Sequence, residues 1–377
     1  MLIGHISDTH LGASPYGLIE REKDFYEAFE EAVDIMIKEH VDAVIHSGDI
    51  FDAPKPSGTA LVRFFRGIRR LAESGAKVFF TLGEHDISRM PATPSPFLFS
   101  EMNLATYVGD GEPHTYNGLT VVGFHKHRKS EIDSLRDKLK GLERLQVEGK
   151  KVLVLHQALI EFHEFAGEIT QQDLPKGFDY YAMGHLHDRK QASFEGFRGP
   201  ICYPGSTEAT SVEGIREREK GFYLVDLSGE TASAQWIKLN SVRPQLKLEV
   251  EYEEIDRIIG SVLEKIGPYK KSPMVNITVK GKNVDRDIAY AKLKQLCDMA
   301  LYCQKSVIDE AIYADEISGR PADIDREMME LAAKIMKSSN AASFAINELL
   351  PALSEGRLDE VANLMWSAFK AGRNLND

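Results

Sequence analysis

The chain lacks the long apolar segments that mark membrane and secreted proteins. No apolar run among its 377 residues approaches the ~20 residues that cross a bilayer. The stretch Met1–Asp8 has neither the basic region nor the apolar region of a signal peptide and instead resembles a first strand. We therefore expect a cytoplasmic protein with no membrane contact.

Cysteine is scarce, and positive charge does not predominate. Cys202, Cys297 and Cys303 form no C-x-x-C pair, which suits a reducing compartment and argues against a disulfide framework or a thiolate zinc site. The net charge of −12 counts against nucleic-acid binding, because Lys and Arg that neutralise phosphates provide most of that affinity. A local basic face would still permit such binding.

The first half of the chain alternates strand and helix patterns. Strands are predicted at residues 1–7, 41–45 and 77–82, and helices at 24–39 and 59–74. This order is typical of an α/β sheet with sites at its strand ends. Further strands at 119–124, 151–156, 180–183, 221–226 and 233–238, with one helix near 130–146, predict a second sheet.

The pattern of predicted elements changes near residues 241–244. Predicted strands at 246–252, 273–280 and 306–313 alternate with helices at 255–266 and 285–300, which indicates a small βαβαβ unit. A Gly- and Pro-containing linker follows at 317–322, and helical stripes begin at Ile324 and Leu358. We predict domains at 1–240, 244–315 and 323–377. The last region either packs on its own domain or docks on a partner.

Five short blocks of Asp, Glu and His stand where predicted strands end. Each block alone is more often a turn or a core histidine than a site, but strand ends of an α/β sheet meet in one crevice. Carboxylates and imidazoles without thiolates suit divalent Mn, Fe or Zn. If extended, Asp8-x-His10 and His185-x-His187 each direct two side chains the same way. The blocks are Asp8-Thr-His10, Gly48-Asp49, Gly83-Glu84-His85-Asp86, Leu155-His156-Gln157 and Gly184-His185-Leu186-His187.

The order of these blocks resembles the signature of calcineurin-like metallophosphoesterases. Within that superfamily, the segments 5–12, 21–29, 46–51, 203–208 and 221–226 are similar to the archaeal double-strand-break repair nucleases of the meiotic-recombination-eleven family. The resemblance implies a four-layer α/β/β/α sandwich of two packed sheets, followed by a small α/β cap and a C-terminal helical region. It covers the layout of nearly the whole chain.

The resemblance also implies a site and an activity. Two manganese ions would be held, one by Asp8, His10 and His187, the other by His156, His185 and position 84, with Asp49 bridging both and His85 protonating the leaving oxygen. The implied function is a 3′–5′ exonuclease and single-strand endonuclease acting at double-strand breaks. Its implied partners are DNA, a second copy of the chain and an SMC-like ABC ATPase of the radiation-sensitivity-fifty family, at the nucleoid. A homodimer face on the helix at 24–39 or at 59–74 stays undecided.

Two residues depart from the family pattern. Glu84 stands where the family has Asn and adds a negative charge and a methylene, so we expect tighter metal binding but weaker polarisation of phosphate. Asp52 replaces a histidine found in many members and adds a carboxylate that repels phosphate. Two alternatives therefore stand beside the nuclease: a general metallophosphoesterase on small diesters, and a DNA-tethering, ATPase-docking scaffold with attenuated cleavage.

Other residues receive interpretations of their own. Asp86 either orients His85 or caps a turn, and buried His5 and His46 are expected in the core or behind the ligands. Basic residues bordering the site are candidates for DNA contact, with ordinary surface charge as the alternative. They are Arg89, His125 and Lys126. Apolar residues of the last helical stripe are candidate anchors for the ATPase, and they are Met365, Trp366 and Phe369.

Overall fold

A computed structural model describes residues 1–164, 167–310, 324–354 and 358–370 of the chain. The chain divides into two compact units, one formed by 1–250, 254–278 and 290–306, the other by 251–253, 279–289 and 307–377. The predicted linker at 317–322 and the side chain of Phe369 lie outside the described residues. No helix in the described part of the chain is long and apolar enough to span a membrane.

Two six-stranded mixed sheets form the body of the larger unit. The first has the order β12-β11-β1-β2-β3-β4, with β1 to β4 parallel and β11 and β12 antiparallel. Its strands are β1 (Leu2–Ile6), β2 (Ala43–His46), β3 (Lys77–Phe80), β4 (Thr106–Tyr107), β11 (Gly221–Asp226) and β12 (Ser233–Lys238).

The second sheet is also mixed, but its antiparallel strands lie at both edges. Its order is β5-β6-β7-β8-β10-β9, in which four central strands are parallel and each edge strand is antiparallel to its neighbour. Its strands are β5 (His114–Tyr116), β6 (Leu119–Phe124), β7 (Lys150–His156), β8 (Tyr180–Gly184), β9 (Lys190–Ala192) and β10 (Ile201–Tyr203).

Alternation along the strands sorts the apolar residues into three cores. In β7, Val152 and Val154 face the core between the sheets, whereas Leu153 and Leu155 face the helix on the outer side. In β3, Phe79 faces the inter-sheet core, while its neighbours on the strand face the opposite way. Two sheets buried on both faces require helical cover on each outer side, which is the predicted four-layer sandwich.

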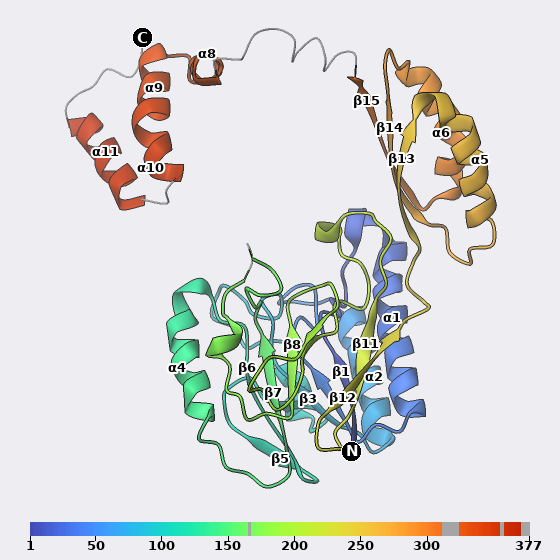
Figure 1. The fold of residues 1–377 in the computed structure, drawn as a ribbon, viewed down its shortest axis with the longest axis vertical. Helices are drawn as coiled ribbons and strands as arrows, with labels where there is room; N and C mark the ends of the chain where they lie inside the picture. Colours follow the sequence, from blue (N-terminus) through green and yellow to red (C-terminus); the bar gives the residue numbers. More distant parts are fainter. Residues whose placement is uncertain (165–166, 311–323, 355–357, 371–377) are drawn as a thin grey trace. The chain divides into compact units, whose positions relative to one another are not determined.

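The outer helices supply that cover. Helices α1 (Ile19–Lys38) and α2 (Gly58–Glu73) lie on one side and α4 (Ile132–Leu142) on the other (Figure 1). Helix α2 begins where the Ser57 hydroxyl accepts the Ala60 N–H at 3.1 Å, a typical N-cap. Its buried residues recur at helical spacing and meet α1, where Gly67 allows the close approach of Phe29. Short helical segments complete this part, namely η1 (Pro15–Gly17), α3 (Phe97–Glu101), η2 (Lys129–Glu131), η3 (Gln171–Asp173) and η4 (Ser211–Glu213).

A buried ion network ties α1 to later parts of the same unit. Asp24 accepts from Arg21 Nη1 at 2.7 Å, from Arg243 Nε at 2.6 Å and from Lys271 Nζ at 3.0 Å. Arg21 also donates to Glu208 at 3.0 Å. Asp24, Arg21 and Glu208 are almost fully buried, so their charges depend on one another.

The remaining elements follow β12. A three-stranded sheet has the order β13-β14-β15, and helices follow at the C-terminal end. They are β13 (Gln245–Glu251), η5 (Tyr252–Glu254), α5 (Ile255–Ile266), β14 (Met274–Gly281), α6 (Arg286–Met299), β15 (Tyr302–Asp309), α8 (Ile324–Met336), α9 (Ser339–Phe344), η6 (Ala345–Leu349), α10 (Leu350–Ser354) and α11 (Leu358–Lys370). The predicted absence of disulfides was wrong here, because Cys297 and Cys303 are bonded while Cys202 is a buried thiol. The two cysteines are six positions apart in the chain, so their spacing gave no C-x-x-C signal.

Candidate metal centre

The structure brings the predicted ligand side chains from both sheets into one cluster. The described residues form five overlapping triads, and the ligand atoms of each triad lie within 4.8 Å of one another. Three of them are Asp8, His10 and His187; Glu84, His156 and His185; and Asp8, Asp49 and His156; the other two join His85 to His10 and Asp52, and to Asp49 and Glu84. The backbone segments after β1, β2 and β3 supply one part, and β7 with the segment after β8 supplies the other, as expected where strand ends converge.

The first group of ligands surrounds a small space. His10 Nε2 lies 3.2 Å from His187 Nε2 and 3.9 Å from Asp49 Oδ2. His187 Nε2 lies 3.9 Å from Asp8 Oδ1. Neighbouring nitrogens on an ion with ~2.1 Å bonds are separated by roughly 3 Å, so this spacing suits ligands of a common cation.

The second group places Glu84 between two histidines. Its carboxylate oxygens lie 3.2 Å from His156 Nε2 and 3.0 Å from His185 Nδ1. Asp49 Oδ2 is 3.3 Å from the same His156 nitrogen, so Asp49 adjoins both groups. The Glu84 side chain is therefore long enough to reach both histidines of this group.

Unpartnered nitrogens in the cluster fit a cation better than internal hydrogen bonds. The buried His156 Nε2 has carboxylates at ion-pair distance but none in hydrogen-bond geometry. Burial by itself lowers the pKa of His156, yet the carboxylates of Asp49, Glu84 and Asp8 raise this pKa well above its ordinary value. Acidic groups thus create a negative potential where neutral imidazole ligands would meet a divalent ion.

Backbone strain and glycines bring the ligands together. Asp8, His10, Asp49 and His185 have positive φ values of 50°, 41°, 52° and 92°. The expectation of extended geometry was therefore wrong for Asp8-x-His10 and for His185-x-His187, although all four side chains enter the same cluster. A Cβ on Gly83 would lie 2.1 Å from Asp49 Oδ1, so only glycine permits this approach. Such strain concentrates at functional sites.

Atoms behind the rings fix the orientation of the histidines. The Ser47 carbonyl lies 2.7 Å from His156 Nδ1, which favours a proton there and leaves Nε2 directed into the cluster. Asp52 Oδ1 lies 3.5 Å from His10 Nδ1, an ion-pair distance outside hydrogen-bond geometry. The Asp52 carboxylate thus faces a candidate ligand from behind.

A group that the sequence prediction missed lies behind His187. Thr210 Oγ1 is 3.3 Å and Glu213 Oε2 is 3.7 Å from His187 Nδ1. Lys220 donates to Glu213 and, at 3.0 Å, to the His187 carbonyl. The spacing Thr210-x-x-Glu213 is a capping-box pattern that could have located this turn, but it carries no signal of a role at the site.

His85 and Asp86 are neighbours in the chain but are held by different partners. His85 Nδ1 bonds the Asp52 carbonyl at 2.8 Å, so Asp86 does not orient this ring. Asp86 accepts backbone N–H groups of Ile50, Phe51 and Gly83 at 3.1, 3.0 and 3.0 Å. Burial and the charge of Asp49 raise the pKa of Asp86 to about 7 despite these bonds. The turn-capping alternative describes Asp86.

Two other predicted histidines are buried behind the cluster. His5 bonds Tyr180 and Ser47, and His46 bonds Thr9. Burial, assisted by neighbouring histidines, lowers the pKa of both rings to about 3, so they stay neutral.

Two cavities adjoin the cluster, and both are lined by Glu84 and His85. One, of about 640 Å³, also includes His187 and Val212. The other, of about 690 Å³, is lined by the three basic residues predicted for DNA contact, Arg89, His125 and Lys126. Lys126 Nζ is held by Glu168 at 2.7 and 2.8 Å, while Arg89 is exposed.

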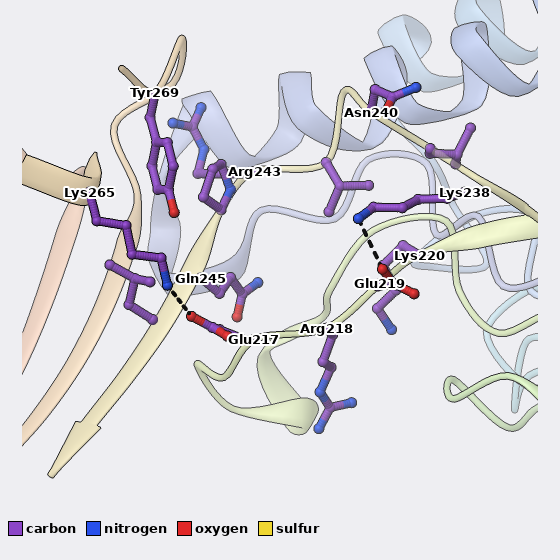
Figure 2. A pocket seen from close by; sticks show the side chains of 14 residues that line it. Glu217, Arg218, Glu219, Lys220, Lys238, Asn240, Arg243, Gln245, Lys265 and Tyr269 are labelled. Carbon is purple, nitrogen blue, oxygen red and sulfur yellow. Dashed lines mark hydrogen bonds and ion pairs between the residues drawn. The ribbon is translucent and has the colours of Figure 1, made fainter. Parts of the chain in front are cut away.

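A third cavity, of about 600 Å³, lies elsewhere in the same unit. Figure 2 shows that its Lys265 and Lys238 are paired, with Glu217 and Glu219 respectively, each at 3.0 Å. None of the candidate ligand triads found among the described residues lies there. The chemistry therefore concentrates at the strand ends.

Comparison with known proteins identifies the family. The sequence profile of the calcineurin-like phosphoesterases matches residues 1–189. The protein called DNA double-strand break repair protein Mre11 in Saccharolobus solfataricus is 31% identical over 95% of this chain and 96% of its own. Proteins of the same name from Sulfurisphaera tokodaii (34% identity, 79% and 78% covered) and Thermoplasma acidophilum (31%, 89% and 94%) are also similar. The chain belongs to the Mre11 family. As a member of that family of metallophosphoesterases, it is a metal-dependent phosphodiesterase with a dinuclear divalent-metal site.

Proposed function

We propose that this chain is a manganese-dependent DNA nuclease that processes double-strand breaks in the cytoplasm, at the nucleoid. The convergence of seven ligand side chains in a member of the Mre11 family supports the proposal most strongly. We assign to it 3′–5′ exonuclease and single-strand endonuclease activity. The two cavities beside the cluster offer room for nucleic acid on either side of His85.

The proposed ligand sets follow the two groups of side chains in the cluster. Asp8, His10 and His187 would hold one ion; His156, His185 and Glu84 would hold the other, with Asp49 shared. A bound pair of ions supplies activation of water and neutralisation of phosphoryl charge.

The protein's own contribution to chemistry centres on His85. Its Nδ1 is engaged by the Asp52 carbonyl, which leaves Nε2 to deliver a proton to the leaving oxygen. Arg89, Lys126 and His125 would contact the DNA backbone from the adjoining cavity wall.

The proposed partners are a second copy of the chain and an SMC-like ABC ATPase. Met365 and Trp366 on α11 are each 57% exposed, which suits anchors for a partner. The apolar faces of α1 and α2 are largely used within the core, which leaves Ile19 and Val62 among their exposed apolar residues for a dimer contact.

The test is cleavage of 3′-labelled and 5′-labelled DNA duplexes with Mn²⁺ by the intact protein, by His85→Ala and by a His114→Ala control on β5. We expect metal-dependent shortening that falls at least ~100-fold in His85→Ala, the usual worth of a positioned acid. The control should cut normally, and both variants should bind two ions per chain.

Other outcomes separate the alternatives. Hydrolysis of bis(p-nitrophenyl) phosphate with no cleavage of DNA would contradict the nuclease and favour a small-diester phosphoesterase. DNA binding with two ions bound but no cleavage would favour the scaffold, and Glu84 and Asp52 would be the residues to change next.

A further inference from the structure

The candidate metal cluster is recessed, whereas one wall of its cavity ends in an exposed apolar side chain. Asp8, His10, Asp49 and His156 are at most 1% exposed, so a reacting phosphodiester has to enter the cavity to reach them. Val212 lines the same cavity as His85 and His187 and is 85% exposed. It is the most exposed large apolar residue among those that the structure describes.

A single exposed valine is ordinary, but this one is held rigidly. It lies in η4 (Ser211–Glu213), where Glu213 Oε2 accepts the Thr210 N–H at 2.7 Å. Glu213 Oε1 accepts from Arg218 Nη1 at 2.5 Å and also from Lys220. The side chains of Glu213 and Lys220 are 4% and 1% exposed, so the support beneath Val212 is buried.

The same support fixes the turn relative to the cluster. Lys220 donates to the His187 carbonyl at 3.0 Å, and Thr210 Oγ1 lies 3.3 Å from His187 Nδ1. The apolar tip therefore keeps a set distance from a candidate ligand. Lys190 and Arg216 line the same cavity and add positive charge for phosphates, although Arg216 Nη2 also lies 3.5 Å from Asp188 Oδ2.

An exposed apolar side chain on a buried, hydrogen-bonded support, in a cavity that also holds cations, is suited to enter between stacked bases. Wedges of this kind unstack a base step and open the duplex locally. A duplex end opened in this way could feed one strand into a recess that a fully stacked duplex cannot enter.

We propose that Val212 is a strand-opening wedge that lets the site act on paired DNA ends. The inference rests on the proposed nuclease function and adds a residue that determines which substrates are cut. Val212 touches base faces and takes no part in bond cleavage.

The test compares three substrates of one sequence: a blunt duplex, a duplex with three unpaired terminal nucleotides, and a single strand. We expect Val212→Ser to lose about tenfold or more in kcat/KM on the blunt duplex and to keep full activity on the opened and single-stranded forms. Val212→Leu should retain cleavage of the blunt end. Ser211→Ala, in the same turn, is the matched control and should behave as the intact protein does.

A second readout does not depend on cleavage. With 2-aminopurine in the terminal base pair, the His85→Ala protein should raise fluorescence on binding, and His85→Ala/Val212→Ser should not. The wedge would be overturned if Val212→Ser lowered kcat/KM equally on all three substrates, or if it left the preference among them unchanged. If the intact protein cuts none of the three substrates, the nuclease proposal fails, but the wedge can still be tested by fluorescence. In that case, the absence of a fluorescence rise with the His85→Ala protein would overturn the wedge.

Discussion

At the scale of single residues, Glu84 adds a third carboxylate to the cluster formed with Asp8 and Asp49. Glu84 lies within 3.2 Å of nitrogens on two candidate ligands, His156 and His185. With Asp8 and Asp49 it would oppose a bound pair of divalent ions with three negative charges. Affinity for hard cations rises with the charge of the ligand set.

Glu84→Asn should therefore weaken binding of the second ion by about tenfold or more, because one carboxylate leaves the ligand set. The measurement is calorimetric titration of metal-stripped protein with Mn²⁺. Glu73→Asn, at an exposed end of α2, is the control and should bind both ions normally. An unchanged second affinity would mean that Glu84 is no ligand. At saturating metal, we expect faster cleavage, since less negative charge faces the phosphate.

The sequence predicted which residues of the cluster would meet, but not what stands behind them. Asp, His and Glu that follow apolar strands can be recognised in the sequence as candidate metal ligands, because few other residue types can bind a metal ion. The Ser47 carbonyl behind His156 carries no signal, because any residue has a carbonyl. Glu213 and Lys220 come from segments outside all five blocks, so only the fold reveals that they adjoin His187.

At the scale of elements, periodicity predicted the long segments and missed the short edges. The predicted helix at 255–266 has the bounds of α5, and the predicted strands at 221–226 and 233–238 those of β11 and β12. By contrast, β4, β9 and β10 have two or three residues, too few for alternation to be visible. The helical stripes predicted from Ile324 and from Leu358 correspond to α8 and α11, but the helices between them, α9, η6 and α10, were not predicted.

Packing of α1 on α2 offers a test of how tightly these elements fit. A Cβ on Gly67 would lie 2.5 Å from the buried ring of Phe29. Gly67→Ala should therefore lower the free energy of unfolding by about 1–3 kcal/mol, despite the better helix propensity of alanine. Gly141→Ala in α4, where a Cβ meets nothing within 4 Å, is the control and should stabilise by up to about 1 kcal/mol. Urea unfolding measures both, and equal shifts would contradict the close packing.

At the scale of the whole molecule, the ion network around Asp24 connects distant parts of one unit. Burial alone raises the pKa of Asp24, but bonds from Arg243 and Lys271 and the charge of Arg21 bring it below its ordinary value of 3.8. A carboxyl whose pKa is lower in the folded state contributes stability above its ordinary pKa. That contribution disappears as the pH falls through the folded value.

Asp24→Asn should cost about 3–5 kcal/mol at neutral pH, because it leaves buried cations without their partner. The difference from the intact protein should shrink as the pH falls below 3.8. Thermal unfolding across a pH series measures it. The control is Asp34→Asn. Asp34 lies on the same helix as Asp24 and is an exposed partner of Arg70, so its loss should lower the free energy of unfolding by no more than about 1 kcal/mol. A pH-independent difference would contradict the charge-based role.

The cluster also joins residues from the two sheets, as the contact of the His185 N–H with Asp8, 177 positions earlier, illustrates. Each of the two proposed ligand sets takes residues from segments of both sheets. We therefore expect a ribosome-bound or partly folded chain to lack both complete sets, since the two sheets must dock before the last histidines arrive. For an enzyme proposed to cut DNA, this delay is a safeguard: the nascent chain stays harmless to the genome until its folding is complete.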